Sequence, residues 1–323
     1  MEYKPQPDRY TNGMLYRRCG DSGIQLPVIS LGFWHNFGNT DCYATGLELV
    51  EYAFDHGVCH FDLANNYGPP AGSAEENFGR MMKQSFAAHR DEMFITSKAG
   101  HEMWPGPYGG CSSRKNLMAS IDQSLKRMNL DYVDLFYSHR YDGITPIDET
   151  MQALVDIVRQ GKALYIGLSK YPVDKLLYAL NYLHDAGVPC LAYQDRYNMF
   201  DRHIEKEHLQ ICMEKGIGAQ GILSSKYLNG IPADSRAARP EGYLKQSDVT
   251  PDKIAKVARL RPIAEQRGQS ISQLAITWIL RRKEIGSVII GARNLDQLKD
   301  SLHAVDNLSL SPSEIELIEN ILK

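Results

Sequence analysis

Residues 133–169 read VDLFYSHRYDGITPIDETMQALVDIVRQGKALYIGLS, and this stretch decides the fold. Residues 133–137 and 164–168 are short and almost continuously apolar, which is typical of strands covered on both faces. Between them, residues 147–159 carry apolar side chains at the spacing of an amphipathic helix. Two apolar runs joined by such a helix predict two parallel strands with a crossover connection.

The same alternation of strand and helix extends in both directions along the chain. Apolar runs predict strands at residues 29–34, 59–63, 93–97, 133–137, 164–168, 190–193 and 287–290. Helical spacing predicts helices at residues 45–56, 74–82, 117–128, 147–159, 173–186, 207–215, 272–281 and 295–304. A hairpin within residues 12–28 precedes the first strand, and a last helix at residues 311–322 begins with the N-cap residue Ser311, followed by Pro312.

Seven strands are clear after the hairpin, and residues 217–220 form a weak eighth candidate. Because eight parallel strands with intervening helices close a barrel, we expect residues 1–323 to form a single α/β domain, a (β/α)8 TIM barrel with an N-terminal hairpin and a C-terminal helix. Its seventh strand is expected to be short or missing. An open, doubly wound sheet is the alternative, but no GxGxxG motif follows the first strand.

The composition excludes several classes of partner. The 323 residues include 36 Lys or Arg and 39 Asp or Glu, so a net charge of −3 provides no field for nucleic acid or acidic membranes. No apolar run approaches the ~20 residues of a membrane span, and residues 1–10 lack the apolar core of a signal peptide. Six cysteines form no CxxC pair, which favours free thiols and a cytoplasmic location.

Ionisable side chains stand at the ends of three successive predicted strands: Asp62, Lys98 and His139. In a β/α barrel the chemistry lies at these ends, and strands ~4.8 Å apart let the side chains converge. Tyr67, in the loop after Asp62, can fold back over the same mouth. We expect the Lys98 ammonium to lower the pKa of Tyr67, Asp62 to hold Lys98, and His139 to bind a carbonyl oxygen. Such a set suits protonation of a carbonyl that receives hydride, and because no side chain supplies hydride, a nicotinamide cofactor is implied.

Each of these side chains also has a purely structural interpretation. Asp62 and Lys98 alone would make a buried ion pair, His139 a hydrogen-bonded histidine, and Tyr67 a packing residue. A zinc site is a further hypothesis, because four candidate ligands lie close in the sequence: His56, Cys59, His60 and Asp62. Their number and spacing disfavour it, so we expect no metal.

Residues 60–79, HFDLANNYGPPAGSAEENFG, resemble the Asp-to-Tyr signature of the aldo-keto reductase superfamily, whose members are β/α-barrel carbonyl reductases that use NADP(H). SKAG at residues 97–100 and YSHR at residues 137–140 resemble its lysine and histidine motifs. The resemblance runs from about Gly13 to the C-terminal helix and implies a catalytic tetrad of Asp62, Tyr67, Lys98 and His139. MWPGPY at residues 103–108 and KYLNGIP at residues 226–232 resemble the branch of bacterial L-glyceraldehyde 3-phosphate reductases, near the potassium-channel β subunits.

This resemblance implies NADP(H), a small aldehyde or ketone substrate of the L-glyceraldehyde 3-phosphate or methylglyoxal type, and a possible homo-oligomer. The implied cofactor-binding residues are Trp34, Ser169, Gln194, Gln220, Lys226, Arg236, Gly291, Arg293, Gln297 and Asp300. The implied substrate-binding residues are Trp34, Tyr67, Trp104, His139 and Arg140.

Relatives carry a Ser-Pro-Leu-like or Thr-Pro-Leu-like segment between the equivalents of Gly218 and Gln220, and this chain lacks it. A true deletion predicts weak NADPH binding and local strain in the barrel. Two alternatives to an aldehyde reductase follow: a cofactor-binding redox sensor with little turnover, and a barrel that no longer binds cofactor. His139, in place of an uncharged Asn, favours the enzyme.

Overall fold

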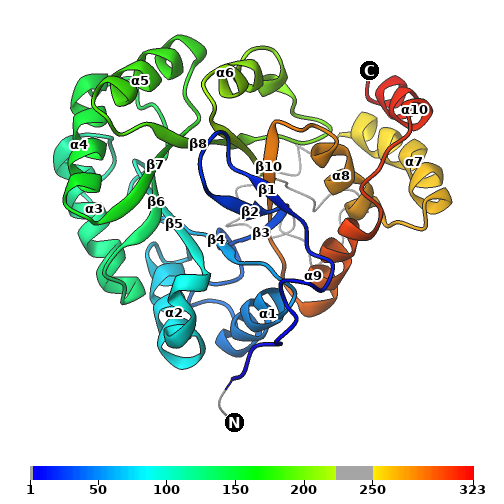
Figure 1. The fold of residues 1–323 in the computed structure, drawn as a ribbon, viewed down its shortest axis with the longest axis horizontal. Coiled ribbons are helices and arrows are strands. Elements are labelled where there is room, and N and C mark those ends of the chain that lie inside the picture. The colour runs from blue at the N-terminus through cyan, green and yellow to red at the C-terminus, as the bar shows by residue number, and fades with distance from the viewer. Residues whose placement is uncertain (1–2, 223–249) are drawn as a thin grey trace.

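The computed structural model describes residues 3–222 and 250–323 (Figure 1). Two of the expected cofactor residues, Lys226 and Arg236, lie outside the described residues, as does the motif at residues 226–232.

Parallel strands close into a barrel in the order β10-β3-β4-β5-β6-β7-β8-β9. These strands are β3 (Ile29–Gly32), β4 (His60–Asp62), β5 (Phe94–Ala99), β6 (Val133–Ser138), β7 (Ala163–Ser169), β8 (Cys190–Arg196), β9 (Gly218–Ile222) and β10 (Ile285–Ile290). The closed order confirms the predicted (β/α)8 TIM barrel and excludes the open, doubly wound sheet.

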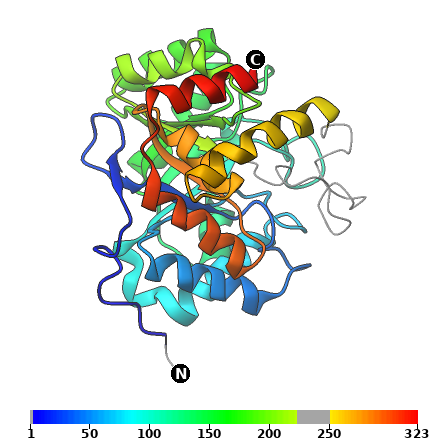
Figure 2. The ribbon, with the colours of Figure 1, turned by 90° about the vertical axis from the view of Figure 1, so that its right-hand side faces the viewer.

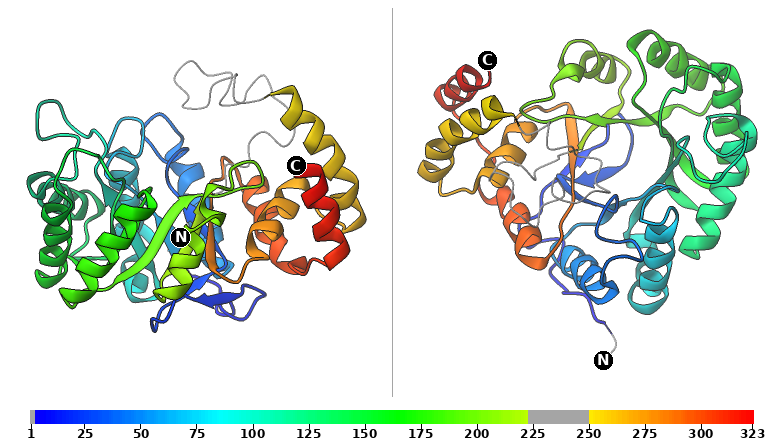
Figure 3. Two further views of the ribbon diagram at one scale, coloured as in Figure 1. Left: turned by 90° about the horizontal axis from the view of Figure 1, so that it is seen from above. Right: turned by 180° about the vertical axis from the view of Figure 1, so that it is seen from behind.

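Helices surround the barrel on all sides (Figure 3). They are α1 (Tyr43–Asp55), α2 (Ser73–Met81), α3 (Arg114–Met128), α4 (Ile147–Arg159), α5 (Val173–Asp185), α6 (His208–Glu214), α7 (Pro251–Gln266), α8 (Ile271–Leu280), α9 (Leu295–Leu302) and α10 (Pro312–Leu322). The sequence did not predict α7, which packs against α10 (Figure 2). Within residues 3–222 and 250–323, no helix has both the length and the apolarity that a membrane crossing requires.

Local sequence signals explain where these elements begin and end. α4 buries Met151, Leu154 and Val155 on one face, as the helical spacing of its apolar residues requires. α10 starts with a capping box, in which the Ser311 side chain accepts a hydrogen bond from the Glu314 N–H and the Glu314 side chain accepts one from the Ser311 N–H. The predicted N-cap at Ser311 is therefore confirmed.

The N-terminal hairpin, β1 (Tyr16–Arg18) and β2 (Gln25–Pro27), covers the end of the barrel where the strands begin (Figure 2). The Arg17 guanidinium donates to the Ile285 carbonyl oxygen at 2.8 Å, at the start of β10. Cys19 packs against the start of β9 so closely that a Cβ on Gly218 would lie 2.3 Å from its Sγ. The hairpin therefore closes the end opposite the mouth at which the strands finish.

The seventh barrel strand, β9, is present, so it is not missing, and at 5 residues it is longer than β3 and β4. It pairs in parallel with β8 over its full length and with β10, with a register irregularity between Ile285 and Ser287. The strand extends two residues beyond the predicted segment 217–220, because pairing partners on both sides supply hydrogen bonds to a sequence with little strand propensity of its own.

Candidate active site

Four ionisable side chains converge where the strands finish. Asp62 ends β4, Lys98 lies next to the last residue of β5, and His139 directly follows β6. Tyr67 lies in the β4–α2 loop, where its N–H donates to the Ala64 carbonyl oxygen at 3.0 Å and its own carbonyl accepts from the Gly72 N–H at 3.1 Å. These bonds fold the loop back over the barrel mouth. We call Asp62, Tyr67, Lys98 and His139 the tetrad.

A buried ion pair forms the centre of the tetrad. The Lys98 Nζ lies 2.6 Å from the Asp62 Oδ2 and 3.4 Å from the Tyr67 hydroxyl oxygen. The Lys98 side chain is 0% exposed and that of Asp62 is 2% exposed. The other carboxylate oxygen of Asp62 accepts from Thr96 Oγ1 at 2.7 Å and Gln194 Nε2 at 3.1 Å. The carboxylate is therefore fixed in orientation, and it directs the ammonium toward the phenol.

Burial sets the protonation of the tetrad. Burial lowers the pKa of Lys98, and the Asp62 carboxylate opposes that shift. Burial, with a further contribution from the charge of Asp62, raises the pKa of Tyr67 well above its usual value. The predicted direction, a pKa lowered by Lys98, is therefore not the net direction in this structure, because burial raises the pKa of Tyr67. Tyr67 is a protonated phenol at neutral pH, which is the form that donates a proton.

His139 lies against the phenol on one side and against His101 on the other. Its ring centroid is 5.9 Å from that of Tyr67 and 4.4 Å from that of His101, with both pairs edge to face. Burial, and then the charge of Lys98, lower the pKa of His139 well below its usual value, so the imidazole is neutral. Its buried Nδ1 has no hydrogen-bond partner among the described residues. A neutral imidazole here is able to hydrogen-bond a ligand oxygen at the mouth.

Polar atoms on three neighbouring residues of β7, β8 and β9 lack partners and indicate a missing ligand. Ser169 Oγ, Gln194 Oε1 and Gln220 Nε2 are buried without a hydrogen bond to any described residue. Buried polar atoms are rarely left unsatisfied. A hydroxyl, an amide oxygen and an amide nitrogen side by side match the NH₂ and C=O groups of a carboxamide such as that of nicotinamide. The residues present therefore fit a nicotinamide cofactor.

Other expected cofactor residues lie after β10 and in α9: Gly291, Arg293, Gln297 and Asp300. The Arg293 N–H donates to the Gln297 side chain at 3.1 Å, which shapes the turn into α9. The Asp300 carboxylate accepts instead from Ser270 Oγ at 2.9 Å and Gln273 Nε2 at 2.9 Å. In this structure Asp300 thus joins α9 to the start of α8.

Three expected substrate residues lie at the rim of the mouth. Trp34 follows β3 and is 42% exposed, with its ring 4.6 Å from that of His35. Arg140 follows His139, and its Nε donates to the Gly100 carbonyl oxygen at 3.1 Å. Trp104 lies in the loop after β5 and, among the described contacts, makes no hydrogen bond or ring contact with the tetrad.

The candidate zinc ligands have other partners. His60 Nδ1 lies 2.8 Å from Ser30 Oγ, His56 Nδ1 lies 2.8 Å from the Tyr52 carbonyl oxygen, and Asp62 pairs with lysine as described. Across residues 3–222 and 250–323, no group of three or more His, Cys, Asp or Glu side chains is arranged to hold a metal ion.

Sequence reasoning missed Thr96 and His101. Thr96 lies two residues before Lys98 on the same face of β5, so the two-residue period of a strand is a signal that would have found it. His101 lies three residues after Lys98, and nothing in the local sequence predicts its contact with His139.

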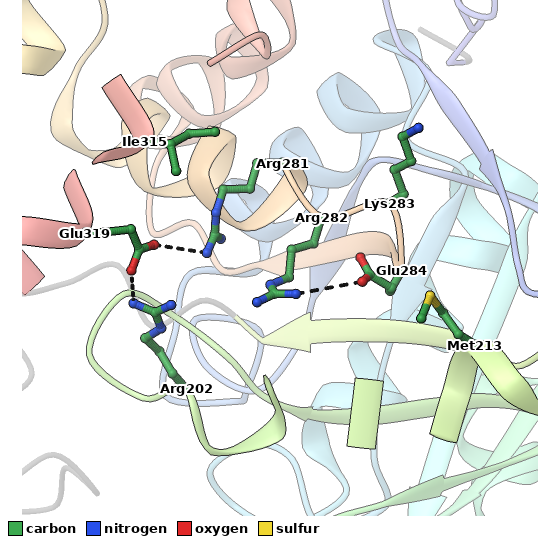
Figure 4. Close-up of a pocket in the computed structure, with 8 residues that line it drawn as sticks. All are labelled: Arg202, Met213, Arg281, Arg282, Lys283, Glu284, Ile315 and Glu319. Atoms are coloured by element: carbon green, nitrogen blue, oxygen red, sulfur yellow. Dashed lines mark hydrogen bonds and ion pairs between the residues drawn. The ribbon is translucent and has the colours of Figure 1, made fainter. Parts of the chain in front are cut away.

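A charged hollow also lies outside the barrel, between α6, the end of α8 and α10 (Figure 4). It is lined by Arg202, Met213, Arg281, Arg282, Lys283, Glu284, Ile315 and Glu319. Its charges pair with one another: Arg281 lies 3.2 Å from Glu319, and Arg282 lies 3.7 Å from Glu284. The hollow shares no residue with the tetrad, and the Arg281–Glu319 pair joins α10 to the end of α8.

Comparison with known proteins agrees with this geometry. The profile of the Aldo/keto reductase family matches residues 28–323. The chain is 47% identical to L-glyceraldehyde 3-phosphate reductase of Escherichia coli (strain K12) over 332 residues, covering 99% of this chain and 95% of that protein. It is 35% identical to a probable voltage-gated potassium channel subunit beta of Arabidopsis thaliana over 325 residues, covering 96% of this chain and 97% of that protein. The barrel, the residues at its mouth and these matches together show that the chain belongs to the aldo/keto reductase family and is an oxidoreductase.

Proposed function

We propose that the protein reduces small aldehydes of the L-glyceraldehyde 3-phosphate or methylglyoxal type with NADPH, with Tyr67 as the general acid. The observation that carries this proposal is the fully buried Lys98 ammonium, which contacts the Asp62 carboxylate and lies 3.4 Å from the Tyr67 hydroxyl. The 47% identity to a protein named L-glyceraldehyde 3-phosphate reductase supports the substrate class.

The residues divide the chemistry as follows. When bound, NADPH supplies the hydride that the carbonyl carbon accepts. His139 donates a hydrogen bond that holds the carbonyl oxygen beside the phenol, and Tyr67 transfers its proton to that oxygen as negative charge develops there. The Lys98 ammonium stabilises the phenolate that Tyr67 becomes, and Asp62 keeps the ammonium charged and in place.

Ser169, Gln194 and Gln220 would hold the nicotinamide carboxamide, because they are neighbours across three strands and their polar atoms are buried without a described partner. Gly291, Arg293 and Gln297 would contact the adenosine phosphates at the start of α9, where helix N–H groups favour anions. Lys226, Arg236 and Asp300 are included among the proposed cofactor-binding residues because of the resemblance to the aldo-keto reductase family. The six free cysteines are compatible with a reducing cytoplasm.

A redox-sensing subunit with little turnover is the second candidate, supported by the 35% identity to a protein named as a channel β subunit. One experiment separates the candidates. NADPH fluorescence is titrated with protein, and methylglyoxal is then added to the complex. Binding followed by rapid loss of fluorescence is expected for the reductase. Binding without oxidation supports the sensor, and no binding contradicts both.

A further inference from the structure

A second layer of ionisable side chains lies just beyond the tetrad. The register pairs Ala99 with Ser138, Ser138 with Leu168, and Ser169 with Gln194. When this register is continued toward the mouth, four residues fall in one layer across the strands: His101, Arg140, Lys170 and Asp195. One residue along a strand is ~3.3 Å, so this layer lies within the length of a three-carbon chain from the carbonyl site.

Lys170 occupies this layer in an unusual backbone conformation. Its φ is +56°, in the left-handed region, which a lysine rarely adopts. Strained residues of this kind cluster at functional sites, where the surrounding structure holds them in place. Lys170 is exposed and forms no ion pair with any described residue. The fold thus holds an unpaired ammonium at the mouth at some energetic cost.

The acid in the layer does not neutralise this lysine by contact. Asp195 accepts from the Tyr193 hydroxyl at 2.6 Å and from the Arg196 N–H at 2.7 Å, and it lies 3.3 Å from His203 Nε2. It is therefore engaged by residues of its own strand and of the loop that follows, and Lys170 has no carboxylate partner among the described residues.

Arg140 adds a second positive charge. Its Nε donates to the Gly100 carbonyl oxygen at 3.1 Å, and it too forms no ion pair with a described residue. The charges of Lys170 and Arg140, after burial, lower the pKa of His101 to about 4, and both also act on His139. The two cations therefore lie close to the group expected to bind the carbonyl, with neutral His101 as a further hydrogen-bonding side chain.

We propose that Lys170, with Arg140 beside it, forms an anion subsite that binds the phosphate group of a phosphorylated aldehyde. This inference rests on the proposed reductase function and adds the residues that select the substrate by charge. Two cations without carboxylate partners match a dianionic phosphate, whereas methylglyoxal and unphosphorylated glyceraldehyde offer nothing for them to pair with. Charge at this layer, rather than the size of the mouth, then sets the preference among three-carbon aldehydes.

The test compares L-glyceraldehyde 3-phosphate with L-glyceraldehyde as substrates of the full chain. Lys170→Asn removes the charge and keeps a residue that tolerates the left-handed backbone, so the variant is expected to fold normally in a thermal melt. The matched control is Lys175→Asn on α5, because this lysine, unlike Lys170, already pairs with a carboxylate: its Nζ lies 3.1 Å from the Asp174 Oδ2. Loss of a charge-assisted hydrogen bond corresponds to roughly tenfold to a hundredfold in binding.

We expect Lys170→Asn to raise the KM for the phosphorylated aldehyde about tenfold or more and to lower its kcat/KM relative to that of glyceraldehyde by the same factor. The control is expected to change this ratio less than twofold. Raising the salt concentration should lower kcat/KM for the phosphorylated substrate in the parent protein, and less so in Lys170→Asn. Inorganic phosphate should raise the melting temperature of the parent protein, and do so only weakly in the variant.

An equal change for both aldehydes would overturn the subsite. A weaker NADPH affinity in Lys170→Asn, with an unchanged ratio of kcat/KM between the two aldehydes, would also overturn it, because Lys170 would then act at the cofactor. If the parent protein reduces neither aldehyde, the proposed function fails. In that case the phosphate-dependent melting shift, which needs no turnover, still tests the subsite. A shift in the parent protein that is lost in Lys170→Asn supports the subsite, and a shift of the same size in both proteins contradicts it.

Discussion

Replacing Lys98 by methionine tests how the buried charge at the centre of the tetrad is held. The Lys98 side chain is fully buried, and its ammonium lies 2.6 Å from the Asp62 carboxylate, which is itself 2% exposed. Lys98→Met keeps the volume but leaves that carboxylate without its counter-ion. Breaking a buried pair by removing one partner destabilises a protein by about 3–5 kcal/mol.

That loss converts to a shift in melting temperature. Unfolding entropy is ~2.1 cal/mol/K per residue, so for 323 residues the melting temperature should fall by about 4–7 °C. The double variant Asp62→Asn with Lys98→Met contains no uncompensated charge, and we expect it to regain most of the lost stability. Lys83→Met, at an exposed lysine, is the matched control and should stay within about 1 °C of the parent protein.

Differential scanning calorimetry at pH 7 measures all four proteins. The reasoning would be refuted if Lys98→Met melted with the control, since the ion pair would then contribute nothing. It would also be refuted if the double variant were no more stable than Lys98→Met, because the penalty would then not arise from the unpaired carboxylate.

Three further predictions concern pH, the cofactor and packing. Burial lowers the pKa of His60 from 6.5 to about 4, so between these pH values the unfolded chain binds more protons than the folded chain. The free energy of unfolding should therefore fall by at most about 3 kcal/mol as the pH drops. Denaturant titrations from pH 7 to 4 should show a shallower decline for His60→Gln than for the parent protein. Ser169→Ala removes a buried hydroxyl that has no partner among the described residues, so thermal stability should not fall. The NADPH affinity measured by fluorescence should fall several-fold. An unchanged affinity would contradict the proposed cofactor contact. A Cβ on Gly79 would lie 2.2 Å from the Arg127 carbonyl oxygen, so Gly79→Ala should destabilise the fold by about 1–3 kcal/mol in thermal melts. Gly23→Ala is the control, because a Cβ there would meet open space and stability should hardly change.

The barrel was predictable because its periodicity is strong. Ile147–Arg159 has the bounds predicted for it, since proline precedes the helix and glycine follows soon after its end. α7 was not predicted, because it buries only a narrow face and has Pro262 in its interior. Its N-cap Thr250, followed by Pro251 and accepting from the Lys253 N–H, is a signal that would have located its start.

The sequence predicts which residues form the tetrad, but it does not predict how deeply each side chain is buried. Strand ends and family motifs identify the tetrad residues, and the structure brings them to one mouth. The sequence carries no information on how deeply Tyr67 is buried, and so the predicted direction of its pKa shift was wrong. The layer that contains Lys170 depends on strand register and on a left-handed backbone, which composition and periodicity do not specify.

The most direct test of the account is the rate of hydride transfer in Tyr67→Phe. The substitution removes only the hydroxyl that lies 3.4 Å from the Lys98 ammonium. In single-turnover stopped-flow measurements of NADPH oxidation by methylglyoxal, we expect the rate to fall by about 10²–10⁴-fold, the usual contribution of a general acid, while NADPH affinity and melting temperature stay near those of the parent protein. A rate within tenfold of the parent protein, with cofactor bound, would show that the proton comes from elsewhere.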